Sequence, residues 1–136
     1  QSGLMIAHVT AAALASENKT LSHPASVDSI PTSAGQEDHV SMAPWAGQKL
    51  QNICDNLEHI LAIELLAAAR AIEAQAPLKA TAEIEDIRSV LRNFAPALRG
   101  DRRHDIEITA VGKAISRGEF LAPLAAATEL DSFTRH

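Results

Sequence analysis

The 136-residue sequence contains a single cysteine, no tyrosine and only 3% aromatic residues. One cysteine excludes an internal disulfide framework, and a chain without disulfides fits a reducing compartment. Hydrophobic residues nevertheless make up 46% of the chain, with alanine and leucine dominant. The sequence therefore predicts a cytoplasmic protein whose core packs through small aliphatic side chains.

An excess of positive charge and a long apolar run are also missing. The net charge is −5, so neither nucleic acid nor an anionic membrane surface is an expected partner. No segment reaches the roughly 20 consecutive apolar residues that a membrane-spanning helix needs. These two absences leave small molecules and other proteins as the expected partners.

No useful length of strand-like alternation occurs, and helical periodicity recurs along the chain, so the predicted fold class is all-α. Residues 4–20 predict a helix with a wide, alanine-rich apolar stripe. Residues 82–121 predict short helices, with Thr81 and Asp105 as N-caps and Gly118 at the end of the last. Residues 99–104 predict a solvated polar turn, and the tail from Pro123 is expected to fray.

Residues 41–76 predict one long helix, with Ser41 as its N-cap and Pro77 just beyond its end. Its apolar residues recur at steps of four and three, which is the pattern of a helix-bundle seam: Ala46, Leu50, Ile53, Leu57 and Ile60. About 34 residues give a rod of about 50 Å, whereas a compact domain of this chain length is about 37 Å across. The fold is therefore expected to be an elongated bundle around this helix, covered in part by other chains or by further sequence.

The sequence makes a specific prediction for each of three side chains on the long helix. Cys54 lies near the seam and is expected to act as a small buried hydrophobe. Glu64 interrupts an otherwise apolar stretch and is expected to be a buried, paired carboxylate. His59 is expected on the polar face.

Residues 21–40 predict a long irregular loop. Pro24 and Pro31 disfavour helix in the residues before them, and the serines, threonines and aspartate offer local hydrogen bonds that compete with helix. Loops of this length within a compact domain are usually functional or disordered. A structural connector and a ligand-binding segment both remain open on these grounds.

The loop contains a run of polar residues, Gln36-Glu37-Asp38-His39, that invites two chemical interpretations. Adjacent side chains point in different directions, so the run is not a ready metal site, although His23, Glu37 and His39 form an alternative ligand set. A catalytic triad drawn from Ser26, Ser29, Asp28 and His39 lacks the G-x-S-x-G nucleophile elbow. Neither interpretation is favoured over a structural or binding role.

The segment SENKTLSHPASVDSIPTSAGQEDHVSMA resembles the region before the longest helix of the histidine ammonia-lyases, in the aromatic amino acid lyase family. SGLMIAHVTAAALASENK, LEHILAIELLAAARAIE, APLKATAEIEDIRSVLR and DRRHDIEIT resemble the flanking regions of the same family. The resemblance implies an all-α homotetramer with long antiparallel helices at its centre. It also implies elimination of ammonia from L-histidine to give trans-urocanate.

The same resemblance implies an electrophilic methylidene-imidazolone group, which the family makes by cyclising an internal Ala-Ser-Gly. This sequence contains no Ala-Ser-Gly, and Ser33-Ala34-Gly35 has the first two residues in the wrong order. The resemblance therefore implies a C-terminal portion of the enzyme that holds no cofactor and is inactive alone.

Three site residues follow from the resemblance. Glu37 matches the family's glutamate that contacts the imidazole of the substrate, a role that suits a carboxylate because it accepts a ring N–H. Gln36 matches a neighbour on the same wall, and Met5 matches a pocket-lining side chain on the preceding helix. Gly35 permits the left-handed backbone that would aim Glu37.

A different class of function remains open. The chain would then be a non-catalytic helical assembly or scaffold module that keeps the family's shape without its chemistry. An Ala-Ser-Gly upstream in a continuous reading frame would favour the enzyme.

Overall fold

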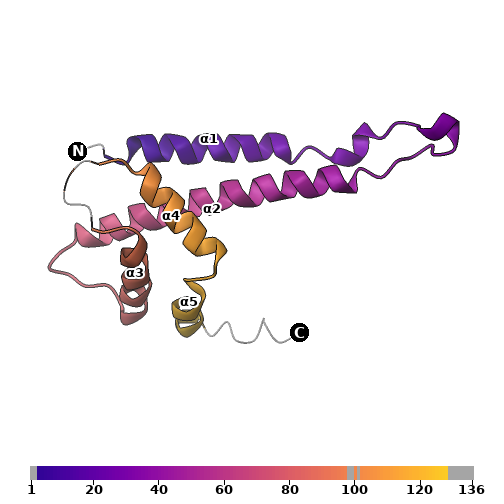
Figure 1. Cartoon of the computed structure of the whole chain (residues 1–136). Helices are drawn as coiled ribbons and strands as arrows, with labels where there is room; N and C mark the ends of the chain where they lie inside the picture. Colours follow the sequence, from indigo (N-terminus) through magenta and orange to yellow (C-terminus); the bar gives the residue numbers. More distant parts are fainter. Residues whose placement is uncertain (1–2, 98–99, 101, 129–136) are drawn as a thin grey trace.

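The computed structural model describes residues 3–97, 100 and 102–128, and its regular elements are helices (Figure 1). The α-helices are α1 (Met5–Leu21), α2 (Ala43–Glu73), α3 (Ala82–Phe94), α4 (Asp105–Ser116) and α5 (Leu121–Thr128). Two short 3-10 helices, η1 (Ala25–Asp28) and η2 (Ser33–Gly35), lie between α1 and α2. The predicted all-α fold with one long central helix is confirmed.

The helices α1 and α2 form an antiparallel pair that dominates the shape of the molecule (Figure 1). The 31 residues of α2 make a rod of about 46 Å. Asn56 ties the two helices together, because its Nδ2 lies 2.9 Å from both Glu17 Oε2 and Asn18 Oδ1. Asn18 in turn donates to the Ile53 carbonyl at 3.4 Å. These bonds fix the carboxyl end of α1 on the side of α2.

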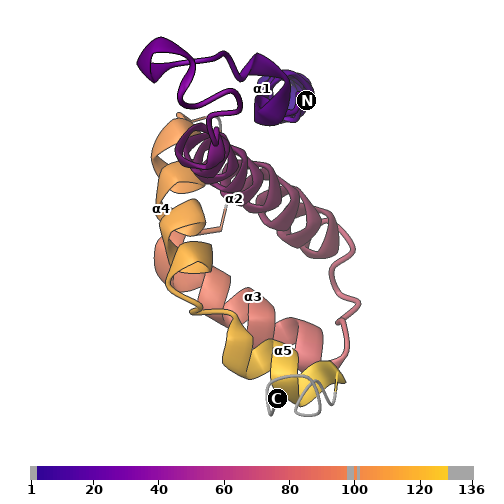
Figure 2. The same cartoon turned by 90° about the vertical axis from the view of Figure 1, so that its right-hand side faces the viewer.

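The hydrophobic core lies where α3 and α4 meet the carboxyl-terminal half of α2, and α5 packs against α3 (Figure 2). Its buried members are mostly small: Ala62, Ala69, Leu91, Ala95, Val111, Ala114 and Phe120. Gly112 marks the crossing of α4 over α2, since a Cβ there would lie 3.8 Å from the Glu58 carbonyl oxygen. Small side chains thus allow the helices to approach closely, as the composition predicted.

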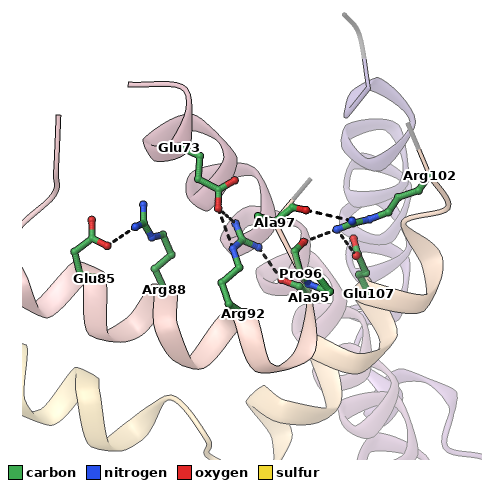
Figure 3. A network of polar contacts seen from close by, with 9 residues as sticks. All are labelled: Glu73, Glu85, Arg88, Arg92, Ala95, Pro96, Ala97, Arg102 and Glu107. Carbon is green, nitrogen blue, oxygen red and sulfur yellow. Dashed lines mark hydrogen bonds and ion pairs between the residues drawn. The ribbon is translucent and has the colours of Figure 1, made fainter. Parts of the chain in front are cut away.

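Ion pairs join the ends of the helices around this core (Figure 3). Arg92 of α3 lies 2.7 Å from Glu73 of α2. Arg102 reaches Glu107 of α4 at 2.5 Å and also donates to the Pro96 carbonyl. Arg102 is exposed, as predicted for a solvated turn, but it also folds back onto buried Glu107, a carboxylate that needs a cation. Arg99 and Asp101 of that turn lie outside the described residues.

Of the three predicted N-caps, Thr81 has its predicted position at α3, whereas Met42 stands at the N-cap of α2 in place of Ser41 and His104 at that of α4 in place of Asp105. Thr81 occupies the N-cap position of α3 without a side-chain capping bond. Its hydroxyl instead bonds the Glu83 carboxylate, whose pKa is lowered first by its own backbone N–H and then by Thr81. The N-cap of α4 is His104, and Asp105 is the first helical residue because its carboxylate pairs with Arg103.

Gly118 ends α4 as predicted, with φ of 74° in the left-handed region. The Gly118 N–H donates to the Ile115 carbonyl at 2.9 Å and the Glu119 N–H to the Ala114 carbonyl at 3.0 Å. This pair of bonds is the Schellman arrangement, which satisfies the last carbonyls of a helix.

The predicted fraying from Pro123 is wrong for residues 123–128, which belong to α5. Pro123 is the third residue of that helix, where its missing N–H costs no helical hydrogen bond. Contacts between α5 and α3 hold the segment in place. Residues 129–136, where fraying was also expected, lie outside the described residues.

Much of the long helix stays uncovered within the single chain. The seam residues Leu50 and Leu57 are 60% and 48% exposed. The expectations of a buried Cys54 and a buried, paired Glu64 are wrong, because both side chains are exposed. The reason is that the other helices of the chain cover only part of α2. In the part of the chain that the structure describes, none of the helices has the length and apolar character that crossing a membrane requires.

Candidate functional site

Residues 22–42, here called the arm, project beyond the ends of α1 and α2 (Figure 1). The sequence predicted an irregular loop at 21–40, but the arm has local order. Its chain goes out through η1, turns back at η2 and returns to α2. An isolated antiparallel bridge pairs Thr32 with Glu37 across the turn. The arm is therefore a folded hairpin-like excursion in place of a structureless connector.

Two sets of hydrogen bonds join the outgoing and returning halves of the arm. The Ser29 hydroxyl donates to the Val40 carbonyl at 2.9 Å. Further out, the Thr32 N–H donates to the Glu37 carbonyl at 2.9 Å, and the Glu37 N–H donates back to Thr32 at 3.4 Å. Both backbone groups of Glu37, its N–H and its carbonyl, are therefore bonded to Thr32.

The turn at the end of the arm is built from consecutive left-handed residues. Ser33, Ala34 and Gly35 have φ values of 55°, 56° and 84°. The left-handed conformation predicted for Gly35 is confirmed, but the same conformation at Ser33 and Ala34 was not predicted. It costs about 1–2 kcal/mol at each non-glycine residue, and the hydrogen bonds from Gly35 to Thr32 and across the bridge offset that cost.

Lys49 of α2 holds the root of the arm. The residue is only 8% exposed, and its ammonium donates to the His23 carbonyl. Ala25 is buried beside it at the start of η1, which packs on α2. Sequence reasoning missed Lys49, because a lysine in a long amphipathic helix normally indicates a solvated position.

Glu37 and Gln36 are both exposed near the end of the arm. Their side chains are accessible to a ligand or to another protein chain. The left-handed turn and the Thr32 bridge determine where this carboxylate stands. Local backbone conformation therefore positions Glu37, and burial in a pocket of this chain does not.

Met5 lies far from Glu37. It is the first residue of α1, and the 17 residues of that helix span about 25 Å before the arm begins. Figure 1 shows the start of α1 and the arm at opposite ends of the molecule. The structure therefore does not bring Met5 to the same place as Glu37 and Gln36 within one chain.

The alternative metal site is not assembled in the described residues. No group of three or more His, Cys, Asp or Glu side chains among them lies close enough to hold a metal ion. The His23 carbonyl is bound by Lys49 at the root of the arm, whereas Glu37 follows the η2 turn and is bridged to Thr32. The Ser29 hydroxyl is bonded to a backbone carbonyl, which also disfavours a nucleophilic role for it.

A separate cavity of about 20 Å³ lies at the other end of the helix pair. Its charged lining includes Glu73 and Arg92, which pair with one another, and Arg102, His104 and Glu107, which form a second cluster. Arg92, Arg102 and His104 are each paired with a carboxylate. This arrangement indicates a structural junction between α2, α3 and α4.

The chain is an all-α segment with two features of an assembling enzyme subunit. Its ordered arm presents an exposed carboxylate, and apolar faces of its helices stay uncovered. A model of the aromatic amino acid lyase family matches residues 1–93. The chain belongs to the aromatic amino acid lyase family.

Relatives with assigned names agree with this membership. The chain is 51% identical over 130 residues to a histidine ammonia-lyase of Burkholderia cenocepacia, covering 94% of this chain and 26% of that protein. It is 52% identical over 119 residues to a histidine ammonia-lyase of Rhodospirillum rubrum, covering 88% of this chain and 23% of that protein. The chain thus spans about a quarter of the length of these relatives.

Solved structures share the fold. The histidine ammonia-lyase of Trypanosoma cruzi matches with a TM-score of 0.87 and 44% identity over 93% of this chain and 25% of that one. A tyrosine aminomutase of Streptomyces globisporus matches with a TM-score of 0.85 and 34% identity, over 93% of this chain and 24% of that one. The same helical arrangement therefore occurs in proteins with different names.

Proposed function

We propose that this chain is the C-terminal part of a histidine ammonia-lyase, which eliminates ammonia from L-histidine to give trans-urocanate. The observation that carries the proposal is the 51–52% identity to histidine ammonia-lyases along nearly the whole chain. In the elimination the bond from Cα to nitrogen breaks, the β-proton leaves, and a double bond forms between Cα and Cβ. This chain contributes one wall of the substrate site and much of the oligomer core.

Glu37 is the residue to which we assign the imidazole contact. Its carboxylate accepts a hydrogen bond from a ring N–H, which fixes the orientation of the ring and favours one of its protonation states. The exposed position of Glu37 and its fixed backbone suit this role. Gln36 stands beside it on the same wall and contributes amide hydrogen-bonding groups.

The family's methylidene-imidazolone group does not fit the residues of this chain. The group forms from Ala-Ser-Gly, and this sequence has none. Ser33-Ala34-Gly35 has the wrong order, and its backbone forms the turn that carries Glu37. No step of the reaction is therefore assigned to such a group here, and the chain is expected to show no turnover alone.

A homotetramer is the proposed assembly, and the separation of Met5 from Glu37 supports more than one copy at each site. If both residues line one pocket, they must come from different chains, since α1 alone spans about 25 Å. Antiparallel packing of the α1–α2 pairs would bring the start of α1 in one copy toward the arm of another. The cytoplasm is the proposed location, because the sole cysteine, Cys54, is exposed and free.

A non-catalytic helical assembly module is the second candidate. One observation favours it: the apolar faces of α1 and α2 that stay uncovered within the chain. The two candidates differ in what the gene encodes upstream. A continuous reading frame with Ala-Ser-Gly before this segment supports the lyase, and its absence supports the module.

The kinetic test compares the full-length protein with its Glu37→Gln variant. Turnover of histidine is measured from the absorbance of the urocanate that forms. We expect kcat/KM for histidine to fall by about 100-fold or more, because the amide cannot replace the anionic acceptor. Asp38→Asn is the matched control, since it neutralises the adjacent exposed carboxylate of the same arm. Unchanged kinetics of Glu37→Gln, or an equal loss in the control, would remove Glu37 from the substrate site.

A further inference from the structure

The arm is long, and few contacts hold it. It contains the residues between the end of α1 at Leu21 and the start of α2 at Ala43. Its far part is not packed on the helix pair (Figure 1). Displacement of a binding group by about 1 Å is enough to lower a reaction rate by about 100-fold. A carboxylate at the end of such an arm therefore needs fixed points along its length.

The structure provides two such points before the Thr32–Glu37 bridge. At the root, the buried Lys49 binds the His23 carbonyl. At the neck, the Ser29 hydroxyl binds the Val40 carbonyl at 2.9 Å. Neither side chain lies next to Glu37 in the sequence, so their contribution would pass through the backbone of the arm.

The neck bond is in register with the bridge. Ser29 stands three residues before Thr32, and Val40 stands three residues after Glu37. The Ser29 bond is therefore the next cross-link inward from the bridge that fixes Glu37. Between the two cross-links the backbone runs through Pro31, whose ring restricts one dihedral angle on the outgoing half.

We propose that Ser29 and Lys49 are positioning residues for Glu37, holding the arm so that the carboxylate stands where the imidazole of the substrate binds. This inference rests on the proposed function of Glu37. Neither residue touches the substrate. Ser29 closes the neck of the arm and Lys49 anchors its root, and loss of either bond lets the end of the arm shift.

The test is a double-mutant cycle in the full-length enzyme with histidine as substrate. We expect Ser29→Ala to lower kcat/KM by about tenfold, the effect of losing one hydrogen bond and the alignment it maintains. Ser29→Thr keeps the hydroxyl and is expected to retain most of the activity. In a Glu37→Gln background, Ser29→Ala is expected to cause little further loss, because the group it positions is already disabled.

Ser22→Ala is the matched control. The Ser22 hydroxyl also donates to a backbone carbonyl, that of Lys19 at 2.7 Å, but this bond caps α1 and does not cross the arm. We expect its kinetics to equal those of the unaltered enzyme. Lys49→Met is the second test variant, because it keeps the length of the side chain and removes the donor. We expect it to lower kcat/KM when Glu37 is present and to cause little further loss in the Glu37→Gln background.

The outcomes separate this inference from the proposed function. If Glu37→Gln leaves turnover unchanged, the proposed role of Glu37 fails. If Glu37→Gln is defective but Ser29→Ala and Lys49→Met are not, only the positioning role fails. An equal loss from Ser29→Ala in both backgrounds would show a general structural effect and would also overturn it. If the Ser29→Ala protein does not fold and assemble, the double-mutant cycle of Lys49→Met with Glu37→Gln separates the same outcomes.

Discussion

Arg92, in the last turn of α3, pairs with Glu73, the last residue of α2, and so joins the ends of the two helices. The Arg92 Nε and Nη2 atoms lie 3.0 Å and 2.7 Å from Glu73 Oε1, and Arg92 Nη1 donates to the Ala95 carbonyl at 2.9 Å. Both side chains are 22% exposed. One guanidinium therefore binds α2 and also the carboxyl end of its own helix, using the fork geometry that a lysine lacks.

We expect Arg92→Met to lower the free energy of unfolding by about 1–3 kcal/mol, since it leaves a half-buried carboxylate and a carbonyl without their donor. Arg92→Lys should recover only part of the loss. The measurement is the midpoint of thermal or urea unfolding.

Arg103→Met serves as its control, because Arg103 forms a pair with Asp105 at the surface, with side chains 78% and 59% exposed. Such pairs contribute little to stability. A midpoint that falls as far in the control as in Arg92→Met would contradict the role assigned to the Glu73 pair.

The Asp105 carboxyl group allows a prediction of how stability depends on pH. The hydrogen bond from Arg103 holds the pKa of Asp105 below its ordinary value of 3.8. Because the folded-state pKa is the lower one, this contribution to stability is present above pH 3.8 and is lost as the pH falls through the lowered pKa. Arg103→Gln should raise the pKa of Asp105 in a chemical-shift titration, whereas Lys113→Gln on the same helix should not. An Asp105 pKa that is the same with and without Arg103 would argue against the pair.

Leu57 provides a prediction for assembly. Its side chain is 48% exposed on α2 within the single chain, although it belongs to the apolar seam. We expect Leu57→Glu to weaken self-association in sedimentation velocity, because it places a charge on a surface that another copy would cover. Gln51→Glu adds the same charge at an exposed polar position of the same helix and should have a smaller effect. A protein that is monomeric before either change would contradict assembly through this face.

Local rules predicted the helices well and some of their ends poorly. Gly118 was predicted to end α4 because only a left-handed residue makes that pair of bonds, and glycine adopts it without strain. Thr81 is the N-cap residue of α3 as predicted, but its hydroxyl binds Glu83, and Asp105 binds Arg103 from inside the first turn of α4 instead of capping it. Competition among nearby polar groups is decided by side-chain geometry, which the order of residues does not specify.

For the candidate site, the sequence pointed to the arm and to Glu37, but not to the groups that hold them. Lys49 and Ser29 gave no signal, since their partners are backbone carbonyls of residues that are distant in the chain. Any residue could supply such a carbonyl. Met5 was grouped with Glu37 by resemblance, yet the helix between them keeps them apart in one chain.

The sequence by itself determined the all-α fold, the long helix and the polar interruption before it, because periodicity, helix propensity and proline act over a few residues. It also determined that the long helix exceeds the size of its own domain. Only the tertiary structure decided which face of that helix stays uncovered and how the arm is clamped. Those features depend on contacts between segments far apart in the chain, and such contacts follow from how whole helices pack.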